Sequence, residues 1–364
     1  MRARMPWNVA QRVLKAAQLH RSQGWKRTLA RVTAGDEHYD AREEELKDSL
    51  TQHLLCGEKI VRFFELTDEE MSSLRESSHT LEVPEGPFQA MFPILLDEAD
   101  LKTVNPPTPT LVSIMNFEDG SIALVLASRR HLMTRETLQP QDLPEGAASE
   151  LHEYSELIGI KHQRLEAIDL LWIPPTGNLI ELRVDFPIGM YQRQAEAAIE
   201  RATTAFSQLL GQNYLTTPVN LFPVIERLYK ATGDGTMVEL AFMVSGSAQK
   251  HEKTRRDGQC CRVEAYHVGG VSVLDQPIEP YRTSVMWTVP IAEDVLSMPE
   301  VSLMGNSVDT AVQAPFLGEM IARNCANLID YGHIRDRIIS HLHSPLPDEV
   351  ASVAVHDDHQ RSQG

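Results

Sequence analysis

The sequence predicts an α+β fold of two domains, and three features indicate this class. Residues 165–211 contain two strand patterns joined by a turn and followed by one long amphipathic helix. Other alternating segments flank glycine-containing turns, which is typical of β-hairpins. The length of 364 residues favours two domains rather than one, and the apolar fraction of 42% is enough to form both cores.

The hairpin-helix unit over residues 165–211 is the clearest part of this prediction. In residues 180–186 apolar and charged side chains alternate, so one face of this strand is apolar. The preceding strand, residues 167–173, is apolar on both faces except at Asp169. A Pro-Pro-Thr-Gly turn between the two strands predicts a hairpin. The alanine-rich helix that follows ends at Gly211, which can adopt the left-handed conformation of a helix C-terminus.

Residues 1–35 form a basic segment with eight Lys or Arg residues and no acid, whereas residues 36–48 contain seven acids. Two helical patterns separated by a glycine-containing turn give the basic segment the outline of a helix-turn-helix. We expect a helical arm whose basic side chains contact phosphate groups. The candidate contacts are Arg12, Lys15, Lys26 and Arg27. Such an arm could also lie on an anionic membrane, dock on a partner, or present a basic face to solvent.

Local patterns predict the remaining elements, and these group into two domains, residues 36–145 and residues 146–343. In the first domain we expect a helix over residues 40–55, a strand over 60–66, a capped helix after Thr67, a strand over 88–96 and a hairpin over 111–127. In the second we expect a helix over 149–161, strands over 220–230, 237–244, 259–268 and 282–289, and a helix over 314–331. Residues 344–364 have few large apolar side chains, so we expect a disordered tail.

A second basic segment occupies residues 250–256, between two predicted strands of an otherwise acidic chain. Loops on a rigid sheet often carry binding residues, so this segment is another candidate for phosphate contacts. Its candidate side chains are Lys250, Lys253, Arg255 and Arg256. A solvated hairpin tip would have the same composition.

The predicted hairpin also carries acids on neighbouring strands, Asp169 on one and Glu181 two residues before Arg183 on the next. In outline this resembles the PD-(D/E)xK nuclease core, in which such acids hold Mg²⁺ beside the scissile phosphate. The resemblance implies that Asp169 and Glu181 bind the metal. Arg183 stands where that family has lysine, and arginine keeps its proton at neutral pH, so it cannot act as a base. The alternative is a structural pair between Asp169 and Arg183 across the two strands.

Several other classes of function have no support in the sequence. The four cysteines, which include the adjacent Cys260 and Cys261, show no zinc or disulfide spacing, and a reducing cytoplasm fits them best. No apolar run is long enough to cross a membrane. The phosphate-binding glycine motifs and the serine-hydrolase motif do not occur. Two histidine pairs could bind a transition metal, but they lie in or near the predicted tail: His341 with His343, and His356 with His359.

These patterns lead us to expect a non-catalytic nucleic-acid-binding protein that uses both basic segments. The net charge of −17 opposes nonspecific attraction to polyanions. A Mg²⁺-dependent nuclease with the hairpin acids is one alternative. The other is a non-enzymatic subunit of an assembly, in which the basic arm docks on an acidic protein or on a second copy of this chain.

Overall fold

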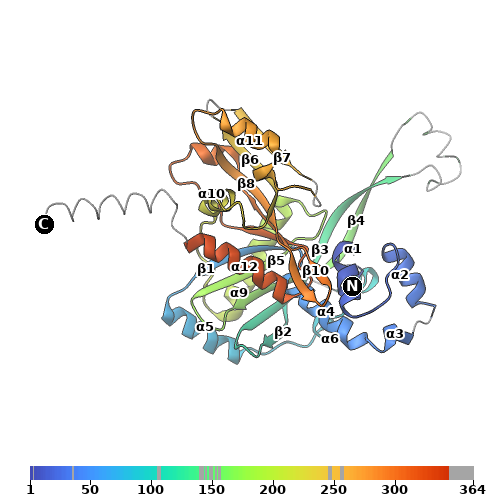
Figure 1. The fold of residues 1–364 in the computed structure, drawn as a ribbon. Coiled ribbons are helices and arrows are strands. Elements are labelled where there is room, and N and C mark those ends of the chain that lie inside the picture. The colour runs from blue at the N-terminus through green and yellow to red at the C-terminus, as the bar shows by residue number, and fades with distance from the viewer. Residues whose placement is uncertain are drawn as a thin grey trace. The chain divides into compact units, whose positions relative to one another are not determined.

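The computed structural model has the predicted α+β class, with helices beside antiparallel strands (Figure 1). It describes residues 1–343 except 3, 35–36, 105–107, 139–142, 144–145, 147–150, 152–153, 155–156, 245–247 and 255–257. The chain divides into two compact units: unit 1 is Met1–Phe63 with Pro218–Gly364, and unit 2 is Phe64–Thr217. The predicted domain boundaries after residues 35, 145 and 343 adjoin residues outside the described ones and stay predictions, as does disorder of the tail.

Unit 2 contains four consecutive antiparallel strands with helices before and after them. The strands are β2 (Thr110–Asn116), β3 (Ile122–Leu138), β4 (Leu157–Ile173) and β5 (Leu179–Asp185). The helices are α5 (Asp68–Thr80), α6 (Pro87–Met91), α7 (Glu98–Thr103) and α9 (Gln192–Leu210). The predicted hairpin-helix unit is therefore confirmed as β4, β5 and α9.

Local capping interactions set the boundaries of helices α5 and α9 in unit 2. The Thr67 hydroxyl accepts the Glu70 backbone N–H while the Glu70 carboxylate accepts the Thr67 N–H, so α5 begins with the predicted capping box. Helix α9 ends at Gly211, whose φ of 69° lies in the left-handed region. Its buried face carries Ala198 and Ala202, whose small side chains let the helix pack closely.

Two predictions in unit 2 are wrong. Residues 88–96 were expected as a strand, but α6 begins there, because Pro87 occupies the first helical turn, where proline loses no hydrogen bond. Residues 149–161 were expected as a helix. Those that the structure describes from Leu157 onward belong to β4, where Ile158 and Ile160 alternate along the strand and pair with β3.

Unit 1 has antiparallel strands in the order β1-β12-β11-β8-β6-β7. Their bounds are β1 (Lys59–Glu65, which extends past the boundary between the units), β6 (Thr236–Val244), β7 (Ala248–Lys253), β8 (Glu279–Met286), β11 (Glu300–Met304) and β12 (Met320–Arg323). A separate pair is β9 (Val289–Ala292) with β10 (Val295–Ser297). The α-helices are α1 (Trp7–Ala16), α2 (Trp25–Val32), α3 (Glu37–Asp40), α4 (Glu43–Cys56), α10 (Phe222–Lys230), α11 (Ala265–Ser272) and α12 (Leu328–His343). Short 3₁₀ turns cover Cys261–Val263 and Ser307–Ala311.

Three predictions in unit 1 are wrong because capping side chains were not recognised. Residues 220–230 form α10 instead of a strand, and the Asn220 side chain accepts the Phe222 N–H at its start. Residues 259–268 form a 3₁₀ turn and α11, since the Glu264 carboxylate accepts two backbone N–H groups of α11. Residues 314–331 contain β12, and helix α12 starts only after Asn327, whose side chain accepts the N–H groups of the first turn.

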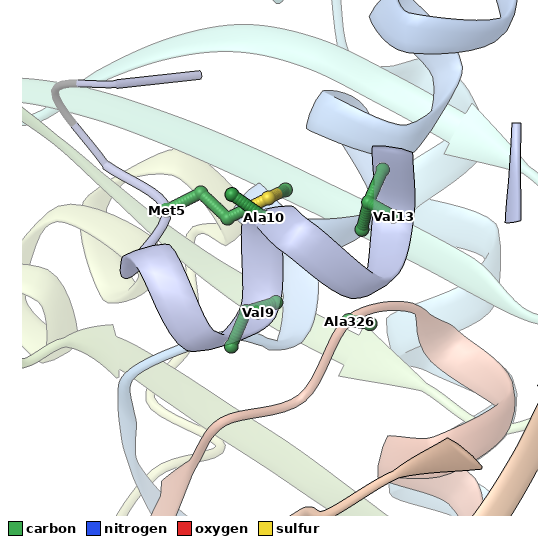
Figure 2. Packing of buried hydrophobic residues seen from close by; sticks show 5 residues of the cluster. All are labelled: Met5, Val9, Ala10, Val13 and Ala326. Carbon is green, nitrogen blue, oxygen red and sulfur yellow. The ribbon is translucent and has the colours of Figure 1, made fainter. Parts of the chain in front are cut away.

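Helix α1 lies in the core of unit 1. Figure 2 shows Met5, Val9, Ala10 and Val13 packed with Ala326, and each of these residues is at most 5% exposed. The predicted basic arm is therefore a folded part of unit 1. Among the described residues, no helix is long and apolar enough to cross a membrane.

Candidate functional site

The predicted metal ligand Asp169 is completely buried in β4. Its carboxylate pairs with the Arg130 guanidinium from β3 and accepts the Asp185 backbone N–H at 3.0 Å. Arg130 also donates to the Asp185 carbonyl oxygen at 3.0 Å. These contacts neutralise the charge of Asp169 within the protein, as a buried carboxylate requires.

Glu181 and Arg183 lie on the other face of the same hairpin. The register pairs Trp172 with Glu181 and Leu170 with Arg183, and directly opposed residues share a face. The Arg183 Nε atom donates to Glu181 Oε2 at 2.9 Å, and the guanidinium lies 4.5 Å from the centre of the Trp172 ring. Asp169, adjacent to Leu170 in the strand, points to the opposite face.

The structure therefore does not bring Asp169 and Glu181 together around a common Mg²⁺ ion. The expected pair between Asp169 and Arg183 is also absent, because each carboxylate has an arginine of its own on its own side of the sheet. Within the described ranges, no group of three or more His, Cys, Asp or Glu side chains could hold a metal ion. His356 and His359 lie outside those ranges.

The four basic candidates of the N-terminal segment have different surroundings. Arg12 is partly buried; burial lowers its pKa, while nearby Asp330 acts in the opposite direction. Lys15 donates to the Asp294 carbonyl oxygen. Lys26 and Arg27 are exposed on α2. Of these four candidates, Lys26 and Arg27 on α2 are exposed, and Lys15 is exposed but contacts the Asp294 carbonyl oxygen.

The second basic segment is a strand rather than a loop as far as Lys253, because residues 248–253 pair with β6. Lys250 is exposed. Lys253 donates to Glu239 at 3.0 Å, and His251 contacts the same carboxylate at 2.9 Å. Arg255 and Arg256 lie outside the described residues. Strand β7 lies beside α11, away from α2 within unit 1 (Figure 1), so the described parts of the two basic segments do not form one surface.

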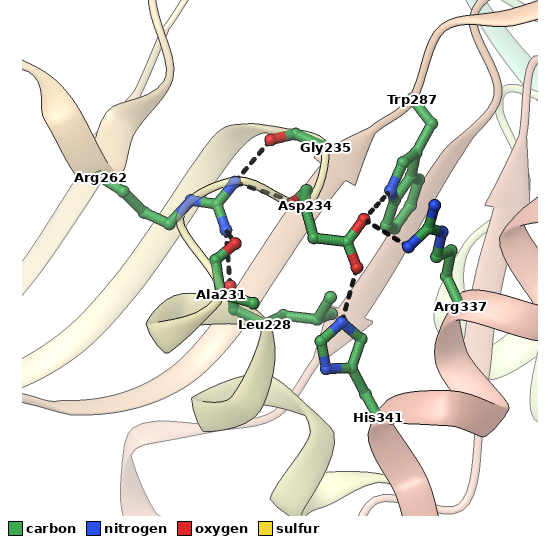
Figure 3. A network of polar contacts seen from close by, with 8 residues as sticks. All are labelled: Leu228, Ala231, Asp234, Gly235, Arg262, Trp287, Arg337 and His341. Carbon is green, nitrogen blue, oxygen red and sulfur yellow. Dashed lines mark hydrogen bonds and ion pairs between the residues drawn. The ribbon is translucent and has the colours of Figure 1, made fainter. Parts of the chain in front are cut away.

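A buried arginine organises the turn between α10 and β6 (Figure 3). Arg262 donates to the carbonyl oxygens of Leu228 at 2.7 Å, Ala231, Asp234 at 3.0 Å and Gly235 at 2.6 Å. These four hydrogen bonds hold the turn in one conformation around the Arg262 guanidinium, which therefore has a structural role. The sequence offered no signal for this role, since Arg262 stood in an expected strand.

The Asp234 carboxylate lies in the same turn and connects it to α12 (Figure 3). It accepts the Trp287 indole N–H at 2.8 Å, contacts His341 Nε2 at 2.7 Å and lies 3.7 Å from Arg337. Burial alone would raise the pKa of Asp234, but the hydrogen bonds from Trp287 and His341 outweigh burial and lower it. His341, a candidate metal ligand in the sequence, thus has a structural role.

Strands β3 and β4 pair over 17 residues each, from Ile122 with Ile173 to Leu138 with Leu157. Among the described residues, β2 pairs with β3 only up to Ala127, and β5 pairs with β4 only from Leu170. Figure 1 shows the two strands continuing together beyond β2 and β5. We call residues 129–138 and 157–166 the ribbon. Both of its edges lack a neighbouring strand within the part of the chain that the structure describes.

The ribbon exposes apolar and basic side chains. Ile158 and Ile160, both on β4, are each 57% exposed. Lys161 is exposed, Arg164 is partly exposed, and His131 opposes Arg164 across the two strands. Burial lowers the pKa of His131, and the cation of Arg164 lowers it further. None of the exposed ribbon side chains that the structure describes is a carboxylate.

The sequence predicted only the first part of β3, because the apolar run ends at Ala127. No element was expected over residues 128–138, and a helix was expected over residues 149–161. The alternation of Ile158 and Ile160 was the available signal for the ribbon. Comparisons with protein-family models, curated proteins and solved structures found no match.

Proposed function

We propose that this protein is a non-enzymatic assembly subunit that associates with a second copy of itself through the ribbon. The observation that carries this proposal is the exposure of Ile158 and Ile160 on a strand without an outer neighbour among the described residues. Unpaired strand edges readily pair with another chain, and exposed apolar side chains favour their own burial.

Symmetry supports a second copy as the partner. Antiparallel pairing of β4 with β4 of a second copy is a two-fold arrangement that uses the same surface twice. It would bring two pairs of isoleucines together on one face.

The test is the molar mass in solution, measured by size-exclusion chromatography with light scattering over a range of concentrations. We expect the wild-type protein to have the mass of two chains and the double variant Ile158→Ser, Ile160→Ser to have the mass of one. Ile188→Ser is the matched control, because Ile188 is 70% exposed in unit 2 but lies outside the ribbon. A wild-type protein of single-chain mass at every concentration would contradict the proposal.

Nucleic-acid binding is a second candidate, because Lys26 and Arg27 are exposed together on α2. In a fluorescence-anisotropy titration with double-stranded DNA and single-stranded RNA, this function requires a Kd that rises with salt. The double variant Lys26→Ala, Arg27→Ala should reduce the logarithmic salt slope by about 2. Substitution of Lys253, Arg255 and Arg256 by alanine tests the second segment. Binding that is absent at low salt would contradict this candidate.

A further inference from the structure

Strand β7 is the outermost strand of unit 1 in the order that the described residues form, since it pairs only with β6 there. Direct pairing places Lys250 beside Phe242 and Glu252 beside Leu240, so these four side chains share one face. His251 and Lys253 are on the opposite face, where they contact Glu239. The first face is the one that α11 covers.

Helix α11 is fixed over this face by a buried histidine. His267 is 3% exposed; its Nδ1 atom lies 2.7 Å from a Glu252 carboxylate oxygen, and its Nε2 atom lies 3.1 Å from the Tyr229 hydroxyl. Its ring also packs edge-on against Phe242, with 5.7 Å between ring centres. These contacts attach α11 to β6, β7 and α10, which leaves a groove between the helix and the outer strand.

A cavity of about 120 Å³ lies in this groove. Strands β6 and β7 and the segment from α11 to Leu274 contribute its lining: Phe242, Val244, Lys250, Glu252, Tyr266, His267, Gly270, Val271 and Leu274. The lining is largely apolar. Tyr266 at its rim is 79% exposed, so the structure leaves a large aromatic side chain uncovered there.

Two charged side chains, Lys250 and Glu252, line the cavity. Lys250 is exposed, and within the described ranges no carboxylate pairs with it. Glu252 is already engaged by His267. An acidic side chain of an incoming segment that lies beside Lys250 would therefore pair with its ammonium group.

We propose that the groove between β7 and α11 binds an extended acidic peptide segment of a partner protein, which adds a strand to β7 and inserts one apolar side chain into the cavity. Backbone hydrogen bonds to a sheet edge supply affinity in this mode of recognition, and a pocket for alternate side chains supplies selectivity. Lys250 selects acidic over basic segments. This proposal does not depend on the ribbon contact, because the groove belongs to the other unit.

The test uses two pools of fluorescein-labelled octapeptides and the immobilised full-length protein. In one pool Asp or Glu alternates with Leu, Val or Phe; in the other Lys or Arg replaces the acids. We expect the acidic pool to be retained in preference to the basic pool. Lys250→Glu should remove this preference. Equal retention of the two pools, or no retention of the acidic pool, would overturn the proposal.

Two adjacent glycines provide a matched pair of variants for the cavity. Gly270 lines the cavity and Gly269 does not, and an added Cβ atom at either position meets nothing within 4 Å. Leucine at either position favours the helix more than glycine does, so both variants should fold. We expect Gly270→Leu to weaken retention of the acidic pool about ten-fold, because it fills the space for the apolar side chain. Gly269→Leu should bind like the wild type. If the Gly270→Leu variant retained the acidic pool as well as the wild type does, insertion of an apolar peptide side chain into the cavity would be contradicted.

Discussion

At the scale of single residues, several buried charges of this protein have partners within the fold. Asp169 is paired with Arg130, Arg183 with Glu181, and Arg262 donates to backbone carbonyls. The sequence indicated that Asp169 was unusual, because it interrupts an apolar strand. It could not indicate Arg130 as the partner, since the two residues are 39 positions apart and meet only through the pairing of β3 with β4.

His53 provides a prediction at this scale. It is buried, its Nδ1 atom lies 2.8 Å from the Cys325 carbonyl oxygen, and burial lowers its pKa from 6.5 to about 4. Because the folded-state pKa is below the unfolded value, protons bind preferentially to the unfolded chain between these pH values. The neutral form of His53 therefore contributes stability to the folded state that is fully present above pH 6.5 and is lost as the pH falls towards 4. Between pH 7 and pH 5, the titration of His53 alone should lower the free energy of unfolding by about 2 kcal/mol.

The measurement is urea unfolding of the wild type and His53→Gln at both pH values. Glutamine can still donate to the Cys325 carbonyl oxygen but does not titrate in this range. Between pH 7 and pH 5, the free energy of unfolding of the variant should therefore fall by about 2 kcal/mol less than that of the wild type. An equal loss in both proteins would show that His53 does not contribute to the acid sensitivity.

At the scale of elements, periodicity predicted the first helix of the N-terminal segment. The apolar spacing in residues 6–20 indicated a helix, and α1 confirms it. Its burial against Ala326 could not be predicted, because that contact joins distant parts of the chain. In the ribbon, by contrast, periodicity did not predict the structure. Its polar residues carry only a weak strand pattern, and the pairing of β3 with β4 determines that these residues form strands.

The packing of α1 leads to a prediction about Met5. Met5 is 1% exposed in the cluster with Val9 and Val13, so truncation should leave a cavity in unit 1. We expect Met5→Ala to lower the free energy of unfolding by about 2–5 kcal/mol in urea titrations. Met91→Ala is the matched control, because Met91 is 41% exposed, and it should change the stability by about 0.5 kcal/mol or less. Similar small effects of both variants would indicate that the N-terminal segment is not part of the core.

At the scale of the whole molecule, the fold class could be predicted from the sequence, whereas the division into units could not. Unit 1 combines both ends of the chain, and unit 2 is the continuous stretch between them. A change in composition along the chain reveals linkers between consecutive domains. It does not reveal that β1 near residue 60 belongs beside β12 near residue 320, because that neighbour is set by long-range pairing.

The four tryptophans allow a test of the two units. Trp172 lies in unit 2, whereas Trp7, Trp25 and Trp287 lie in unit 1. Compact units with separate cores need not unfold in one transition. In urea, we expect the fluorescence midpoint of a variant that keeps only Trp172 to differ from that of Trp172→Phe. Coincident midpoints by fluorescence, together with a matching transition by circular dichroism, would show that the two units unfold together.

The discontinuous composition of unit 1 also has a consequence for biosynthesis. Translation proceeds from the N-terminus, so α4 and β1 leave the ribosome long before α12 and β12, against which they pack. The same holds for α1 and Ala326. Unit 2 is synthesised completely in the interval. The nascent chain must therefore keep the apolar surface of its first helices uncovered, or shielded by a chaperone, until the last strand and helix have emerged.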